Sequence, residues 1–191
     1  MSNTPSTMLD IGTQAPNFSL PEPLTGNTVS LSLFENKPLL VVFSCNHCPY
    51  VLHILQSFVE YTDTYMAQGL SVVMINANDV DNYTDDSPEK MIELIQKYKI
   101  NFQYLYDEQQ QVANAYQAAC TPDFFLFDDS HALVYRGQFD NARPKNFEPV
   151  NGADLTLATQ ELLDNKAISV TQLPSMGCNI KWKPGNEPAY F

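Results

Sequence analysis

The residues of this sequence best suited to chemistry are two cysteines separated by two residues. Cys45 and Cys48 follow the apolar run Leu39–Phe43, and Pro49 comes directly after the second of them. Proline costs little at the first position of a helix, so Pro49 predicts a helix that begins there with Cys48 as its N-cap. Unpaired backbone amides and the positive end of the helix dipole favour a thiolate at such a position. We therefore predict that Cys48 is the nucleophile, with His47 as a further aid when it is protonated.

Two other uses of the cysteine pair are weaker interpretations. A cysteine is often a small buried hydrophobe, but packing explains poorly why two thiols share a polar turn. A closed structural zinc site needs four ligands, and no second Cys-x-x-Cys or His-x-x-x-His follows in the sequence. Cys120, Cys178 and His131 are isolated candidates. We therefore expect redox or nucleophilic thiol chemistry and no bound metal.

The elements that must position the cysteines are predicted to form a βαβ unit. Apolar residues recur with helical spacing from about residue 49 to residue 66, which predicts a helix with one buried face. Gly69 ends that helix, and the apolar segment Leu70–Asn76 predicts a second strand. Two strands joined by a helix should be parallel, with a right-handed crossover. Further helices are expected at 88–98, 107–118 and 154–163, and the aromatic residues 102–106 are expected to pack in the core.

The loop after the second predicted strand, residues 76–87, is polar and acidic. Carboxylates in a row could bind a metal, but a solvated loop is the more common outcome, and we interpret the segment in that way. Ser87 and Pro88 then predict an N-cap and the first position of the next helix. The aspartates of this loop are Asp79, Asp81, Asp85 and Asp86.

A second segment of chemical interest contains Cys120, Thr121 and Pro122 in a row, directly before an apolar run. A proline there is tolerated only at the start or the edge of a strand, because it lacks a backbone donor. Residues 128–131 and 132–137 then predict a turn and the second arm of a β-hairpin. The spacing leaves open whether the bond between Thr121 and Pro122 is cis or trans.

Both ends of the chain are expected to lie outside a single domain of residues 11–165. Residues 1–10 are polar and should be flexible, and residues 15–20 and 28–31 predict a β-hairpin at the start of the domain. The tail of residues 166–191 lacks helical periodicity and should pack on the domain as an irregular segment anchored by Trp182. Cys178 in this tail could resolve a disulfide, pair with another protomer or stay a free thiol.

The net charge of −12 argues against nucleic acids and membrane surfaces as partners, because both would favour a basic patch. No apolar run approaches the ~20 residues of a membrane span, and the first ten residues do not resemble a secretory signal. We expect a soluble cytoplasmic protein, in which a disulfide is more often catalytic or transient than structural. Four cysteines would also suit a periplasmic protein whose leader has been removed.

Over residues 10–165 the sequence resembles the thioredoxin-like branch of the AhpC/TSA peroxiredoxin superfamily. The resemblance rests on Gly12–Leu20, on Lys37-Pro38 before the first buried strand, on the turn Cys45–Tyr50 and on Ala119–Phe125. The Cys-Asn-His-Cys-Pro-Tyr turn is similar to that of a small peroxiredoxin-like subfamily. The resemblance implies an α/β, thioredoxin-like fold: a central mixed β-sheet flanked by helices, with an N-terminal β-hairpin extension and an irregular C-terminal tail.

For the site, the resemblance implies that Pro122 is cis and lies against the cysteine turn. Thr121 would then offer backbone groups to an extended substrate, and Cys120 would come near Cys48. No tightly bound organic cofactor is implied, because the electrons reside on sulfur.

The sequence departs from the family pattern in two respects. When thioredoxins are aligned on Cys48, their second cysteine falls at Val51, so the pair here lies one turn earlier. Peroxiredoxins carry a threonine three residues before their peroxidatic cysteine, and Cys45 takes that place. Their partner arginine is not evident either, and Arg136 and Arg143 are the candidates that could substitute. These departures count against efficient peroxide activation, which needs donors aimed at the oxygen that becomes charged.

We predict a thiol-disulfide oxidoreductase in which Cys48 attacks a disulfide, or is oxidised to a sulfenic acid, and a neighbouring thiol resolves the intermediate. Cys45 is the first choice of resolving thiol and Cys120 the second. The partners would be a thiol, disulfide or peroxide substrate and a cellular thiol reductant, and the oligomeric state is left open. One alternative is a thiol-dependent peroxidase that uses the same Cys48. The other is a redox-inert protein that holds a metal through Cys45, Cys48 and Cys120.

Overall fold

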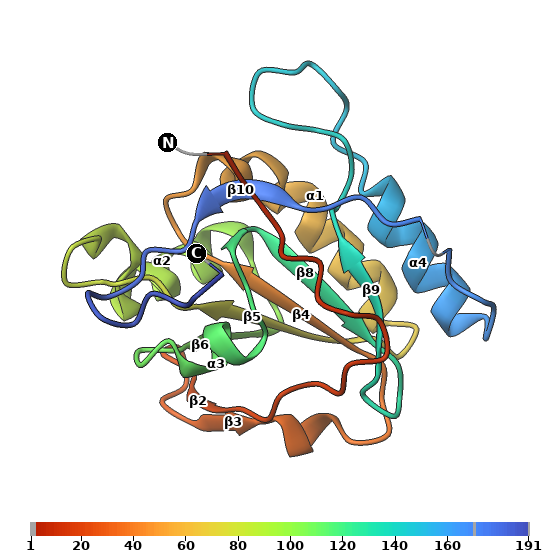
Figure 1. Cartoon of the computed structure of the whole chain (residues 1–191), viewed down its shortest axis with the longest axis horizontal. Coiled ribbons are helices and arrows are strands. Elements are labelled where there is room, and N and C mark those ends of the chain that lie inside the picture. The colour runs from red at the N-terminus through yellow and green to blue at the C-terminus, as the bar shows by residue number, and fades with distance from the viewer. Residues whose placement is uncertain (1–2, 170, 191) are drawn as a thin grey trace.

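The protein is built around a five-stranded mixed sheet with the strand order β6-β5-β4-β8-β9 (Figure 1). The structure is a computed structural model and describes residues 3–169 and 171–190. The parallel strands are β4 (Leu39–Ser44), β5 (Ser71–Asn76) and β6 (Gln103–Tyr106). Strand β8 (Asp123–Phe127) pairs antiparallel with β4, and β9 (Leu133–Gly137) pairs antiparallel with β8. These strands confirm the predicted central mixed sheet, its βαβ unit and its β-hairpin.

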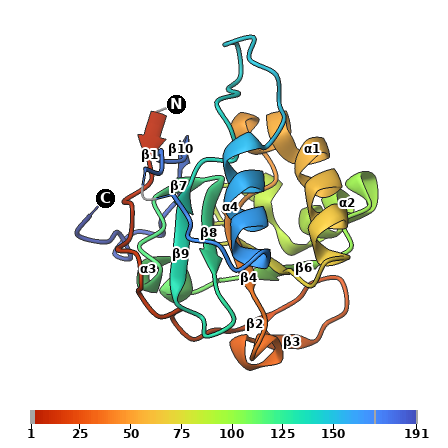
Figure 2. The ribbon, with the colours of Figure 1, turned by 90° about the vertical axis from the view of Figure 1, so that its right-hand side faces the viewer.

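Long helices cover one face of this sheet, and shorter elements cover the other (Figure 2). The first face carries α1 (Pro49–Met66), α2 (Pro88–Tyr98) and α4 (Ala153–Leu163). The second carries α3 (Gln111–Ala115) and the predicted N-terminal hairpin of β2 (Ser19–Pro21) and β3 (Thr28–Ser30). The short 3-10 helices are η1 (Leu31–Phe34) and η2 (Thr84–Asp86). Within the described residues, no helix is long and apolar enough to span a membrane.

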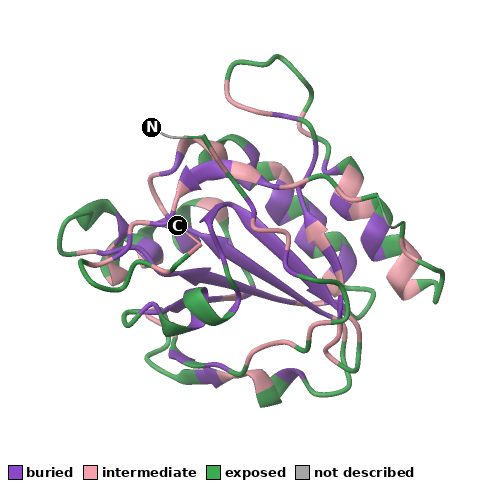
Figure 3. Ribbon diagram, viewed as in Figure 1, coloured by how far each residue is buried: buried purple, intermediate pink, exposed green. Residues whose placement is uncertain are grey.

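Strand β4 is buried along its whole length (Figure 3). Its side chains alternate between the two faces of the sheet, and other elements cover both faces. Leu40 and Val42 point toward the long helices and join their apolar cluster. Leu39, Val41 and Phe43 point the other way, into a second cluster with the hairpin and α3. A strand covered on both faces requires a continuous apolar run, which is why the sequence shows this strand clearly.

A second, smaller sheet joins the two ends of the chain in the order β1-β10-β7. Its strands are β1 (Asn3–Pro5), β10 (Met176–Asn179) and β7 (Cys120–Thr121), and both pairings are antiparallel. Residues 3–5 and 176–179, within the segments expected to be a flexible N-terminus and an irregular tail, thus form short strands. Strands of two to four residues are too short to show a side-chain period, and their partners lie far away in the sequence.

The predicted helices match the structure except for the one expected at 107–118. The helix found there, α3, is much shorter because Gln110 (φ 60°) and Gln117 (φ 51°) adopt left-handed conformations on either side of it. The Asp107 carboxylate accepts a hydrogen bond from the amide of Ala113 at 2.8 Å. The aromatic segment 102–106 packs in the core, as expected, and supplies β6, and Trp182 is buried in the second apolar cluster.

Phe58→Ala tests how firmly α1 is fixed to the sheet. The buried ring of Phe58 lies 5.6 Å from that of Phe124 and 5.8 Å from that of Phe139, between ring centroids. Truncation of a buried phenylalanine should lower the free energy of unfolding by about 3–5 kcal/mol, measured by urea denaturation. Leu52→Ala, on an exposed side of the same helix, should cost much less. Equal losses in the two variants would contradict this assignment of the buried face.

Candidate active site

Cys48 lies at the N-terminus of α1, where the sequence predicts it. It is the N-cap residue, with extended dihedral angles (φ −65°, ψ 122°), and Pro49 takes the first helical position. The turn that carries it follows the carboxyl end of β4, so a buried strand and a long helix together fix the position of the thiol. Cys48 is fully buried, and its Sγ lies 3.2 Å from the carbonyl oxygen of Thr121.

Neutral hydrogen-bond donors around Cys48 stabilise its thiolate. The largest contribution comes from the thiol of Cys45. The Thr121 hydroxyl, the Cys178 thiol and the Val51 backbone amide add smaller ones. Burial opposes ionisation, and so does the Thr121 carbonyl, because it accepts a hydrogen bond only from the protonated thiol. The donors prevail and lower the pKa of Cys48 to about 5.

Cys45 lies in the opposite electrostatic environment. Burial raises the pKa of its thiol well above the ordinary value, and the hydrogen bond to Cys48 and the charge of Asp86 raise it further. The Thr121 hydroxyl, 3.5 Å from the Cys45 Sγ, acts in the other direction. The two environments push the pKa values of the two thiols apart, which assigns them different chemical roles. Cys45 stays a neutral donor, and Cys48 carries the charge.

The strands β7 and β10 bring two further cysteines to this region. Cys178 on β10 lies opposite Thr121 on β7, and Asn179 lies opposite Cys120. Residues that face each other across two strands point to the same side of the sheet, and neighbours along a strand point to opposite sides. The side chains of Cys178 and Cys120 therefore point to opposite sides.

The thiol that reaches Cys48 from outside the turn is that of Cys178. It forms one buried cluster with Cys45 and Cys48. Burial and the hydrogen bond to Cys48 raise the pKa of Cys178 to about 12. The Cys120 thiol contacts the carbonyl of Pro122 at 3.6 Å instead. The structure thus brings the predicted Cys45 and Cys48 together. The third thiol beside them is that of Cys178, whereas the sequence analysis expected Cys120 there as the second choice of resolving thiol.

Thr121 and Pro122 lie against the cysteine turn, as the resemblance implies. The peptide bond between them is cis. The hydroxyl and the carbonyl of Thr121 contact the thiols of Cys45 and Cys48, respectively. The backbone of Thr121, expected to face an extended substrate, is paired with the tail strand β10.

A buried carboxylate that the sequence analysis missed holds the turn in place. The solvated-loop interpretation is wrong for Asp86 and Asp79, which are both buried. Asp86 accepts hydrogen bonds from the backbone amide of Asn46 and the side-chain amide of Asn78, each at 2.7 Å. Its Oδ2 lies 2.8 Å from Nδ1 of His47. Burial alone would raise the pKa of Asp86, but these three partners hold it below the usual range.

The topology contains a signal that could have located Asp86. The strands β4 and β5 are parallel neighbours, and Ser44 at the end of one pairs with Asn76 at the end of the other. Loops that follow the carboxyl ends of neighbouring parallel strands meet at the same edge of a sheet. The acidic loop after β5 therefore had to lie beside the cysteine turn after β4.

His47 is held by Asp86 and stacks on Tyr83, with ring centroids 6.0 Å apart and planes 4° apart. Contact with the Asp86 carboxylate raises the pKa of His47, and the charge of Cys48 raises it further. Because the attraction between two charges is mutual, a protonated His47 favours the Cys48 thiolate in return. This interaction supports the predicted auxiliary role of His47.

Three groups in this region could bind a metal ion together. Potential ligand atoms of Cys45, His47 and Asp86 all lie within 4.8 Å of one another. Cys48 and Cys120, expected as ligands in the metal-binding alternative, are not part of this group. A closed zinc site requires four ligands, and this group supplies three.

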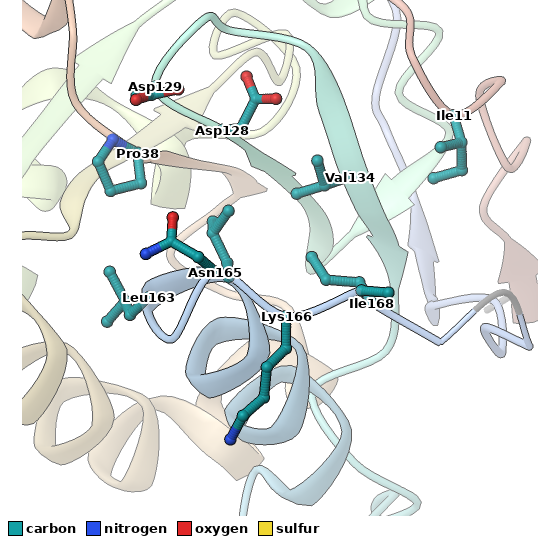
Figure 4. Close-up of a pocket in the computed structure, with 11 residues that line it drawn as sticks. Ile11, Pro38, Asp128, Asp129, Val134, Leu163, Asn165, Lys166 and Ile168 are labelled. Atoms are coloured by element: carbon teal, nitrogen blue, oxygen red, sulfur yellow. The ribbon is translucent and has the colours of Figure 1, made fainter.

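A pocket of about 620 Å³ lies away from the cysteines (Figure 4). Its lining includes Pro38, which directly precedes β4, whereas the cysteine turn directly follows that strand. Asp128 and Asp129 of the β8–β9 turn and Lys166 after α4 also line it, and none of its lining residues is a cysteine. The pocket therefore lies at the opposite edge of the sheet and is separate from the thiol site.

Similarity to known proteins covers most of the chain. The model of the AhpC/TSA family matches residues 11–136. The thiol-disulfide oxidoreductase ResA of Halalkalibacterium halodurans is 26% identical over 124 residues, which are 64% of this chain and 65% of that protein. The chain thus matches just under two thirds of that relative's length.

Solved structures extend the similarity to the whole fold. An uncharacterized conserved protein from Geobacillus kaustophilus matches with a TM-score of 0.94 and 44% identity, over 97% of this chain and 98% of that one. The thioredoxin domain of a thiol-disulfide oxidoreductase from Bacteroides vulgatus matches with a TM-score of 0.58 and 19% identity, over 76% and 95% of the two chains. The second match shows the fold alone and confirms that it is thioredoxin-like.

The ionisation of Cys48 can be followed without a reagent that must reach it. Thiolate absorbance in the ultraviolet should reveal one group that ionises far below the ~8.5 of a free cysteine. Because the folded protein stabilises the anion, the signal should persist at neutral pH and disappear as the pH falls through about 5. Cys48→Ser should lack the signal, and Cys120→Ser should keep it. A midpoint near that of a free thiol would contradict the assignment.

Asp86→Asn should lower the pKa of His47, because it removes the negative charge that raises it. The imidazole resonances in an NMR titration report this change directly. Asp85→Asn is the matched control, since Asp85 is the exposed neighbour in sequence and its backbone carbonyl, which binds the Asn46 side chain, is retained. An unchanged His47 titration in Asp86→Asn would show that the ion pair does not form.

Proposed function

This chain belongs to the AhpC/TSA family, and from that membership we propose that it is a thiol-disulfide oxidoreductase acting through Cys48. The observation that carries the proposal is the buried Cys48 at the N-terminus of α1, which clusters with Cys45 and Cys178. Donors in this surrounding lower the pKa of its thiol to about 5. The activity in the name of the ResA relative supports the same chemistry.

The reaction begins when the Cys48 thiolate attacks one sulfur of a substrate disulfide. A bond forms between Cys48 Sγ and that sulfur, the substrate bond breaks, and the other substrate sulfur leaves as a thiolate. A resolving thiol of the protein then gives its proton to the leaving thiolate and attacks Cys48 Sγ. The bond between Cys48 Sγ and the substrate breaks, and the second substrate sulfur leaves as a thiolate that takes a proton from water. Two electrons have moved to the substrate, and a cellular thiol reductant must reduce the disulfide left in the protein.

Cys45 is the first choice of resolving thiol. It lies in the same turn and the same buried cluster as Cys48, and its thiol makes the largest contribution to the lowered pKa of Cys48. Cys178 makes the same kind of contact from β10 and replaces Cys120 as the second choice. Cys120 points to the other side of β7 and contacts Pro122.

Peroxidase activity is the second candidate function, since a thiolate of low pKa is also what peroxide requires. The two arginines that could substitute for the family's partner arginine are engaged elsewhere. Arg136 Nε donates to the carbonyl of Leu9 at 2.7 Å, and Arg143 donates to the carbonyl of Asp140 at 2.6 Å. These contacts favour a disulfide over a peroxide as the substrate, and a cytoplasmic location stays a prediction.

Cys48→Ser should lower the rate of oxidation of the reduced, metal-free protein by a small disulfide about 100-fold or more, because it removes the nucleophile of the covalent step. Thiol loss after rapid mixing gives the rate, and peptide mass spectrometry identifies the disulfide, which we expect to join Cys48 to Cys45. Cys120→Ser is the matched control and should react like the parent. Parent-like behaviour of Cys48→Ser with both a disulfide and hydrogen peroxide would mean that the nucleophile is wrong.

The same experiment separates the alternatives. Faster oxidation of Cys48 by hydrogen peroxide than by the disulfide would place peroxidase activity first. About one equivalent of zinc in the purified protein, lost on alkylation of its thiols, would favour metal binding by Cys45, His47 and Asp86 over thiol exchange.

A further inference from the structure

The tail strand β10 pairs with β7 (Figure 2), and its Cys178 lies in the same buried cluster as the nucleophile. Cys178 lies opposite Thr121, and the amide of Ile180 donates to the carbonyl of Ala119 at 3.1 Å. The tail thus runs antiparallel to the segment that leads into Pro122 and is paired with it through the backbone. An extended polypeptide could use the same backbone groups only in place of β10.

This pairing also brings a sulfur of the tail against the nucleophile. The Cys178 side chain packs with Cys48 in one buried cluster, and its thiol favours the Cys48 thiolate as a donor. A disulfide substrate must bring one of its sulfurs to the same place, because attack requires contact between that sulfur and Cys48 Sγ. The tail therefore has the form of a bound substrate, with an extended backbone on β7 and a cysteine side chain at the thiolate.

The nucleophile is closed to solvent while the tail is in place. Cys48 and Cys45 are 0% and 1% exposed with β10 in place. A Cβ at Gly177 would lie 2.0 Å from the Thr121 carbonyl oxygen, so only glycine allows β10 to approach β7 this closely. The strand β1 pairs with the other edge of β10 and covers it from outside.

We infer that β10 is an internal substitute for the extended substrate that the resemblance implies, and that β10 must move away from β7 before such a substrate can pair there. The inference rests on the proposed function and adds a displaceable cover to its site. A small disulfide or a peroxide has no extended backbone with which to compete for β7, so it reacts with Cys48 only when β10 has moved away by itself. The tail therefore slows the reaction of Cys48 with small substrates more than its reaction with polypeptides, and it does not abolish either reaction.

The inference also orders the two candidate resolving thiols. While a polypeptide occupies β7, Cys178 is displaced together with β10. Cys45 stays in the turn beside Cys48, so its sulfur attacks Cys48 Sγ and resolves the mixed disulfide. The polypeptide then leaves as a dithiol, and β10 returns with Cys178 to the Cys48 sulfur once the thiol reductant has restored the thiolate.

Gly177→Ala tests this inference by forcing β10 away from β7. The added Cβ overlaps the Thr121 carbonyl, so the variant should be alkylated at Cys48 by iodoacetamide about tenfold faster or more, which corresponds to about 1.4 kcal/mol in favour of the open tail. Reduction of a polypeptide disulfide, such as that of insulin, should accelerate with it. Gly185→Ala is the control, because it strains the backbone of the same tail at a positive φ (89°) while its Cβ meets nothing within 4 Å.

The outcomes distinguish a failure of the inference from a failure of the proposed function. If Cys48 in the parent already reacts as fast as in Gly177→Ala, or if Gly185→Ala has the same effect, the tail does not cover the site. If Gly177→Ala exposes Cys48 to alkylation but no disulfide is exchanged, the covering tail stands and the proposed function is wrong. Circular dichroism establishes that the variants compared are folded.

A second measurement tests the displacement of β10 even if Gly177→Ala does not fold correctly. In a protein with Cys45→Ala and Cys178→Ala, the mixed disulfide at Cys48 cannot be resolved by either contacting thiol and can be trapped. Hydrogen exchange at residues 176–180 should speed up when the trapped partner is a cysteine-containing polypeptide and stay slow when it is a small thiol. Protection that is retained with the polypeptide would overturn the inference.

Discussion

The site depends on keeping a sulfur anion stable where water does not reach it. An ion in a buried environment is costly unless hydrogen bonds replace its hydration. Here the replacement comes from neutral donors: the thiols of Cys45 and Cys178, the hydroxyl of Thr121 and the amide of Val51. These donors belong to the cysteine turn, the tail strand, β7 and the first turn of α1. The low pKa of Cys48 is therefore a property of tertiary packing, which local sequence alone does not supply.

Burial and donors make the two thiols of the turn unequal. Burial raises the pKa of Cys45 most, and the hydrogen bond to Cys48 and the charge of Asp86 raise it further, whereas donors dominate at Cys48. Environments that push neighbouring pKa values apart assign one group as the proton holder and the other as the anion. Because Asp86 also binds the amide of Asn46 between the two cysteines, the same contact fixes the shape of the turn and its charge distribution.

Local signals were enough to predict the frame of the site. Pro49 marked the start of α1, and the apolar run of β4 showed a strand buried on both faces, because each depends on neighbours in the sequence. Asp86 was missed because a polar, acidic composition is typical of exposed loops, and its burial depends on partners from two other segments. The position of Cys178 was missed for a related reason. It follows from the pairing of a four-residue strand with β7, and nothing in the tail itself specifies that partner.

A thiolate that is buried needs a way for its substrate to reach it. If β10 stays in place, the donors that stabilise the anion also exclude the substrate that it should attack. Exchange of one strand for another resolves this conflict, because an incoming polypeptide can replace the backbone hydrogen bonds that β10 gives up, and the net cost in hydrogen bonds is small. What differs between competitors is the close approach at Gly177. A segment with a larger residue there must lie farther from β7 than the tail does, so it binds less closely and is replaced again when β10 returns.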